Sequence, residues 1–99
     1  DPAGRLEIVC PKAYADIEKV ANAAKAGKIV ILNVVDTKAS LAKRILDFSF
    51  GVASALNLNV GKAAERVFVI SKSSEPLSDE DREYLIAQDV LKAEDENAR

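Results

Sequence analysis

The sequence predicts an α/β fold, a two-layer sandwich in the order β-α-β-α-β-β with two main helices on one face of a small mixed sheet and a short C-terminal helix. Three apolar segments, residues 5–10, 28–35 and 66–71, have the length and composition of strands. Two segments with helical periodicity separate them, so the strands that each helix joins are expected to run parallel through right-handed crossovers. We divide the chain into a core domain, residues 1–74, and an acidic C-terminal helix and tail, residues 75–99.

Composition argues against several classes of function. The 99 residues include no histidine, which removes the commonest general base and metal ligand, and the four glycines are isolated, so no phosphate-binding loop is present. We therefore expect neither an enzyme nor a metal or cofactor site. Scattered basic residues and only five aromatic residues argue against nucleic-acid binding. A single cysteine fits a reducing cytoplasm.

The first third of the chain is expected to form strand, helix and strand after a loose lead-in at residues 1–4. Residues 5–10 alternate as a strand that buries Cys10, and Pro11 begins a one-sided amphipathic helix that ends at Gly27. Residues 28–35 form a continuous β-branched run, which indicates a central strand buried on both faces. Asp36 and Thr37 follow it. They are either a ligand position at the end of a strand or the loop that caps the next helix.

The remaining elements follow from local patterns. Residues 57–60 are a short strand or turn, Gly61 is a break, and residues 66–71 are an apolar strand. Ser78 and Asp81 have the spacing of a capping box and begin a short helix that packs on its own domain or on a neighbouring molecule. Nine acidic and three basic residues lie between residues 75 and 99, and the tail is expected to fray from residue 94.

The long helix at residues 38–58 is apolar on two sides. Because one side of a small sheet cannot cover both stripes, we expect one to face the sheet and the other to meet another protein surface. That surface is a second copy of the chain, which makes the stripe a dimer interface, or a partner peptide, or both. A fully covered central helix is the alternative. Gly51 costs a helix about 0.5–1 kcal/mol relative to alanine, which a close helix-helix approach would explain, as would a kink or a tolerated defect. The predicted sheet-facing residues are Leu41, Ile45, Phe48, Val52 and Leu56; the predicted interface residues are Ala42, Leu46, Phe50, Gly51 and Ala53.

The same helix carries a recognisable motif. Residues 42–48 read AKRILDF and are followed by Gly51, which resembles the hallmark helix of the SepF family of cell-division proteins. The similarity continues in order over residues 5–74, including a phenylalanine at Phe68 in the last strand. Phe50, Asn59 and Ala64 depart from the family pattern. The acidic tail is also unlike bacterial members and, with the Lys/Glu-rich surface, fits an archaeal relative. These departures argue more against bacterial-type ring polymerisation than against dimerisation or FtsZ binding.

The resemblance implies a non-enzymatic, cytoplasmic homodimer that binds the C-terminal tail of the tubulin-like protein FtsZ. It also implies a link to the inner face of the cell membrane at the division site, through an N-terminal amphipathic segment that lies outside this sequence. Carried over by position, the partner-binding residues are Lys43, Arg44, Phe48 and Phe68. The alternative function, of a different class, is that of a regulatory domain that senses a small ligand in a pocket near Asp36 and Thr37.

Overall fold

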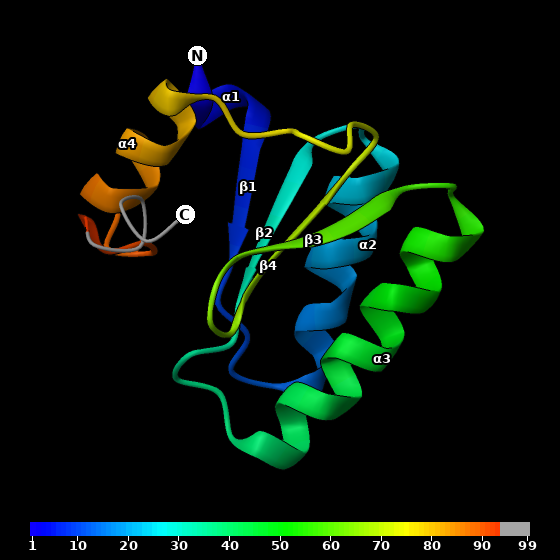
Figure 1. Ribbon diagram of the computed structural model, residues 1–99. Coiled ribbons are helices and arrows are strands. Elements are labelled where there is room, and N and C mark those ends of the chain that lie inside the picture. Colours follow the sequence, from blue (N-terminus) through cyan, green and yellow to red (C-terminus); the bar gives the residue numbers. More distant parts are fainter. Residues whose placement is uncertain (94–99) are drawn as a thin grey trace.

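The computed structural model describes residues 1–93, so the predicted frayed tail lies outside the described residues. The chain forms a four-stranded sheet with helices on both of its faces (Figure 1). The elements in order are α1 (Pro2–Arg5), β1 (Leu6–Val9), the 3-10 turn η1 (Tyr14–Asp16), α2 (Ile17–Lys25), β2 (Ile29–Asn33), α3 (Ala39–Ala55), β3 (Asn59–Ala64), β4 (Val67–Ser71) and α4 (Asp79–Ala87).

The sheet is mixed, as predicted, with the strand order β1-β2-β4-β3. β1 and β2 are parallel, whereas β4 is antiparallel to both of its neighbours. β3 therefore runs in the same direction as β2. The two strands that α3 connects are not neighbours, because β4 lies between them. This order places β3 at one edge of the sheet, beside the C-terminal half of α3 (Figure 1).

The main core lies between the sheet and the helices α2 and α3. Val30 and Leu32 of β2 are fully buried against these helices, whereas Ile31 is fully buried on the opposite face. The prediction of a central strand covered on both sides is thus confirmed. α2 ends as predicted, because Gly27 has a φ of 82° that other residues rarely adopt.

The C-terminal helix α4 packs on its own domain, over the face of the sheet opposite α2 and α3. Leu85 is completely buried there, in a cluster with Leu6, Ile31 and Val69. The predicted capping box is present, since the Ser78 hydroxyl accepts from the Asp81 amide and the Asp81 carboxylate accepts from the Ser78 amide. The buried Asp81 also pairs with Arg5, which ties α4 to the N-terminal end of the sheet.

Four local expectations are wrong. The first amphipathic helix does not begin at Pro11, because residues 14–16 form the 3-10 turn η1 and α2 begins at Ile17. Residues 1–4 are not a loose lead-in, because Pro2 begins the short helix α1 and its side chain is buried. Cys10 is exposed rather than buried, since β1 ends at Val9 and Cys10 lies outside the strand, before the buried Pro11. Gly61 does not break the chain. It lies inside β3 and pairs with Val69.

The turn that precedes α2 depends on an ionised side chain. The Asp16 carboxylate accepts hydrogen bonds from the backbone amides of Lys12, at 2.7 Å, and Ala13, at 3.1 Å. These bonds, with a smaller contribution from Lys19, hold the Asp16 pKa below its ordinary value of 3.8. The carboxylate therefore stabilises the fold above pH 3.8, and this stabilisation is lost as the pH falls through the lower folded-state pKa.

Replacing Asp16 with asparagine should lower the melting temperature at pH 7 and have a smaller effect below pH 3.8, where aspartate is itself becoming protonated. Thermal unfolding followed by circular dichroism over this pH range tests the prediction. Glu18→Gln is the matched control, since Glu18 is exposed and has no bond to the turn. An Asp16→Asn deficit that is equal at all pH values would show that charge is not the cause.

Candidate functional site

The sheet-facing stripe of α3 differs from the predicted one. Ala42, Ile45, Ser49 and Ala53 are its buried residues, so the helix is rotated toward its small side chains. Ala42 and Ala53 were expected to face a partner and instead lie in the core of their own chain. Leu56 was expected to face the sheet and is 39% exposed, because α3 ends at Ala55. Small residues on the buried stripe let the helix approach the sheet closely.

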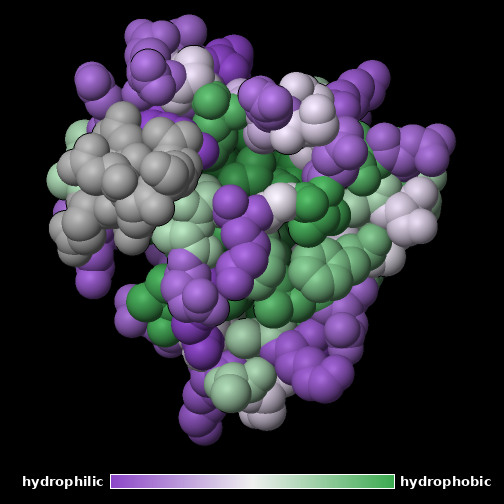
Figure 2. Space-filling view, viewed as in Figure 1, coloured by the Kyte–Doolittle hydropathy of each residue, from purple (hydrophilic) through white to green (hydrophobic). Residues whose placement is uncertain are grey.

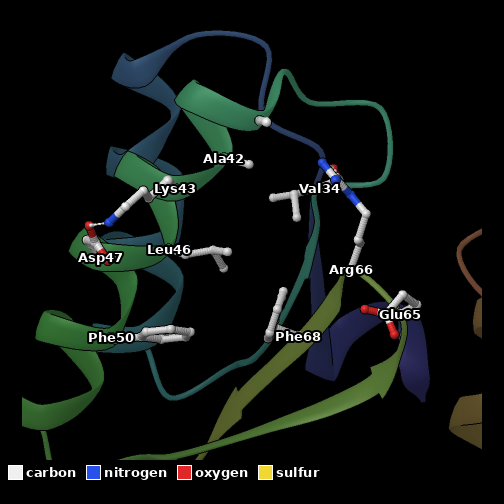
Figure 3. A pocket seen from close by; sticks show the side chains of 10 residues that line it. Val34, Ala42, Lys43, Leu46, Asp47, Phe50, Glu65, Arg66 and Phe68 are labelled. Carbon is white, nitrogen blue, oxygen red and sulfur yellow. Dashed lines mark hydrogen bonds and ion pairs between the residues drawn. The ribbon is translucent and has the colours of Figure 1, made fainter.

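With α3 in this orientation, a groove lies between α3 and the beginning of β4, and we call it the α3–β4 groove. Its volume is about 320 Å³, and apolar side chains from both elements meet across it (Figure 3). Phe50 of α3 and Phe68 of β4 have ring centroids 6.0 Å apart in an edge-to-face arrangement. Phe50 is nevertheless 38% exposed. The lining residues are Val34, Ala39, Ala42, Lys43, Leu46, Asp47, Phe50, Glu65, Arg66 and Phe68.

Charged side chains stand at the rim of the groove. The Lys43 ammonium lies 3.3 Å from the Asp47 carboxylate one helical turn away, and both side chains are exposed. On the other side, Lys62 pairs with Glu65 and lies 5.8 Å from the centroid of the Phe68 ring. Exposed pairs of this kind contribute little to stability, about 0–1 kcal/mol each. Lys43 can therefore exchange its carboxylate for one from a partner at small cost.

Arg66 has a structural role at the end of the groove. It adopts a left-handed backbone conformation, with a φ of 64°, in the turn between β3 and β4. Its guanidinium donates to the Val34 carbonyl at 2.8 and 3.1 Å and to the Thr37 carbonyl at 2.9 Å. Because these bonds hold the loop before α3, they also fix where α3 begins and hence where the groove lies.

The structure brings together only part of the predicted partner-binding set. Lys43 and Phe68 line the α3–β4 groove, and Ala42, Leu46 and Phe50, assigned from sequence to a dimer interface, line it with them. Arg44 and Phe48 do not. The Arg44 guanidinium lies 4.1 Å from the centroid of the Tyr14 ring, on the flank of α3 that faces α2. Phe48 is half-buried and lies about 200° around the helix from Phe50.

Sequence reasoning missed the combination of Leu46 and Phe50 with Lys43. A signal for it was available, because residues 43, 46, 47 and 50 have the i, i+3, i+4, i+7 spacing of one helical face. Gly51 is exposed, and a side chain added there would meet no atom within 4 Å. No packing within the described part of the chain therefore explains this glycine.

The region proposed for a small ligand is arranged differently. Asp36 lines a hollow of about 350 Å³ at the end of β2, together with Asn33, Glu65 and Arg66 among others. Thr37 does not line it, because its buried hydroxyl donates to the Pro11 carbonyl at 3.1 Å. Neither Asp36 nor Thr37 caps α3, whose N-cap residue is Lys38. Across residues 1–93, no group of three or more acidic or cysteine side chains could hold a metal ion.

Comparison with known proteins identifies the family. The model of the family "Cell division protein SepF" matches residues 7–74, which include the whole groove. The chain belongs to the SepF family. Its relatives include the cell division protein SepF of Bifidobacterium animalis, 35% identical over 80% of this chain, and that of Rhodococcus erythropolis, 32% identical over 82%. The SepF of Mycobacterium tuberculosis is 31% identical over 82% of the chain.

The chain spans about half or less of the length of these SepF relatives, 51% of the Bifidobacterium protein and 38% of the Rhodococcus protein. The aligned part contains α3, whose motif carried the resemblance, and the sheet that supports it. Among the described residues, no helix is both long enough and apolar enough to cross a bilayer. The α/β fold described above thus covers the region that the chain shares with its cell-division relatives.

Proposed function

We propose that this protein is an adaptor of the division ring that binds the C-terminal tail of FtsZ in the α3–β4 groove. Membership of the SepF family supports the choice of partner, and the groove supports the choice of site. The single observation that carries the proposal is the exposed Phe50 ring, which stands against Phe68 on the helix that bears the family motif. An N-terminal segment outside this sequence would link the complex to the inner face of the cell membrane.

The groove suits a short peptide with apolar anchors beside acidic residues. Phe50, Phe68 and Leu46 offer an apolar surface for one or two anchors, and Lys43 at the rim offers a cation for a neighbouring carboxylate. A site of this size binds one tail weakly. Many tails are displayed along one FtsZ filament, so an adaptor with two sites gains avidity from the second contact. No chemical step is required.

Titration of the protein with a labelled peptide of the FtsZ C-terminal tail from the same organism tests the proposal. Fluorescence anisotropy should show saturable binding in the micromolar range that standard non-specific peptides do not reach. A scrambled peptide of identical composition is the control, since it keeps the charge and removes the order of anchors. Equal binding of both peptides would contradict a specific site, and no binding of either would contradict the proposed partner.

We further propose that the protein acts as a homodimer in which the exposed face of α3 around Gly51 meets a second copy. Gly51→Lys should leave the monomer folded, because a side chain at this position enters open space and lysine is favoured over glycine in helices by about 0.7 kcal/mol. Light scattering should then show a dimer for the unaltered protein and a monomer for the variant. A dimer that tolerates the lysine would place the interface elsewhere, and an unaltered protein that stays monomeric at high concentration would remove the dimer.

A further inference from the structure

A further hollow, separate from the α3–β4 groove and from the hollow near Asp36, lies on the α4 side of the sheet. The loop that joins β4 to α4 lines it. Two adjacent cavities of about 110 and 200 Å³ share Gly61, Val69, Ser74 and Pro76 as lining residues, and we call the pair the Gly61 hollow. Val69 belongs to the α4 side of the core, and Gly61 is paired with it directly, so the missing side chain of Gly61 would point to that side. It would meet no atom within 4 Å.

A glycine inside a strand weakens the strand and often marks a place where a ligand or another backbone approaches closely. Gly61 has an ordinary negative φ, so its backbone conformation does not require a glycine. The destabilisation of β3 by Gly61 is therefore not explained by a turn that needs glycine. The open space above it is what the glycine provides.

Within the described part of the chain, a cation without an ionic partner faces this hollow. Arg82 extends from α4, and its Nη1 is buried without a hydrogen-bond partner among residues 1–93. The adjacent Asp81 carboxylate is occupied by Arg5, and the exposed Glu75, which lines the same hollow, makes no ion pair with Arg82 in the described structure. A buried donor without an acceptor costs about 1–3 kcal/mol, which a bound carboxylate or carbonyl would recover.

β3 provides the means for a peptide to reach Arg82. It is an edge strand, paired with β4 on one side and with no strand of the described residues on the other. In an added strand, a residue opposite Gly61 would point toward the Gly61 hollow, whereas its two neighbours, opposite Val60 and Lys62, would point toward the α3 side. That side carries the exposed Val60, at 43%, and Phe50, and Figure 2 shows apolar side chains gathered in the middle of the face that includes β3.

We propose that the partner peptide adds as a strand to β3 and that Arg82 binds an acidic side chain of it across Gly61. The recognised pattern is an acidic residue between two apolar ones, with the acid on the Arg82 side and the apolar residues on the Phe50 side. Charge complementarity selects an acidic peptide, because the open cation is Arg82 and its own acidic neighbours are either paired or exposed. The inference rests on the proposed binding of the FtsZ tail and adds a second specificity determinant to it.

Peptide titration of three variants tests this inference. Arg82→Gln should weaken binding of the FtsZ tail peptide about tenfold, because it removes a charge-assisted hydrogen bond that the peptide gains on binding. Gly61→Val should weaken binding by a similar factor while the fold is kept or improved, since valine is favoured in strands and fills the Gly61 hollow. Lys72→Gln is the matched control, because Lys72 carries the same charge in the linker that leads to α4, is exposed and does not line the hollow.

A peptide with its acidic residues replaced by the corresponding amides completes a double-mutant cycle between Arg82 and the peptide. It should bind the unaltered protein more weakly, and Arg82→Gln should weaken its binding no further. The Gly61 amide resonance should shift on titration in an NMR spectrum, which reports the site even if Gly61→Val fails to fold. Unchanged affinity in Arg82→Gln, with affinity lost in Phe50→Ala, would overturn the role of Arg82 and leave the groove in place. Absence of binding by the unaltered protein would overturn both.

Discussion

Phe50→Ala should weaken binding of the FtsZ tail peptide about 30-fold or more, equivalent to a loss of about 2 kcal/mol. Among the residues that line the α3–β4 groove, Phe50 is the large apolar side chain that is exposed, and its ring stands edge-to-face against Phe68 at 6.0 Å between centroids. Binding would cover both rings and exclude water from the pair. Because Phe50 is 38% exposed in the free protein, its truncation creates no internal cavity and should leave the fold intact. Anisotropy titration and thermal unfolding of the same sample separate the two effects.

Phe48→Ala is the informative control for this experiment. Phe48 was the anchor predicted from the family motif, but it lies on the other flank of α3 and does not line the groove. It should change the affinity by less than about threefold if the α3–β4 groove is the site. A large loss with Phe48→Ala and none with Phe50→Ala would move the binding site to the flank that carries Tyr14 and Arg44.

Leu85→Ala should lower the free energy of unfolding by about 2–5 kcal/mol, which is a large part of the 5–15 kcal/mol typical of a whole domain. Leu85 is fully buried between α4 and the sheet, so its loss leaves a cavity that the surrounding side chains cannot close completely. The loss reduces the free energy of unfolding of the whole domain if α4 unfolds together with the sheet. Urea denaturation followed by far-ultraviolet circular dichroism measures it.

Glu83→Ala is the control, since Glu83 lies on the same helix and is exposed. It should change stability by less than about 0.5 kcal/mol. A Leu85→Ala variant as stable as this control would show that residues 1–74 fold independently of α4. The two domains assigned from sequence would then be the better description of the chain.

The fold was predictable because its strongest signals are local. The β-branched run of β2, the one-sided helix that ends at Gly27 and the Ser78–Asp81 capping box each specify an element within a few residues. The errors lie where an element ends, which depends on tertiary packing. Cys10 continues the apolar pattern of β1, but the strand ends before it, and Gly61 looks like a break until β4 pairs with it.

The candidate site was less predictable than the fold, for a geometric reason. The sequence shows that α3 has more apolar surface than one sheet covers, but it does not fix the rotation of the helix about its axis. Ile45 is buried as predicted, but Ala42 and Ala53 are buried with it whereas Leu56 is not. Phe50 rather than Phe48 consequently lies at the groove. Arg82, whose Nη1 has no hydrogen-bond partner among residues 1–93, has no sequence signal, because the pairing of its neighbour Asp81 with Arg5 joins residues far apart in the sequence.

The strand order β1-β2-β4-β3 has a consequence for synthesis of the protein on the ribosome. β4 lies between β2 and β3 in the sheet but is made after both, so neither of them acquires its main partner until residues 67–71 have left the exit tunnel. Before that moment β1 is the strand available to β2, and Ile31 lacks the β4 and α4 residues among which it is fully buried in the finished fold. A chaperone that shields apolar nascent segments would therefore be needed longest in the interval in which α3 and β3 are translated.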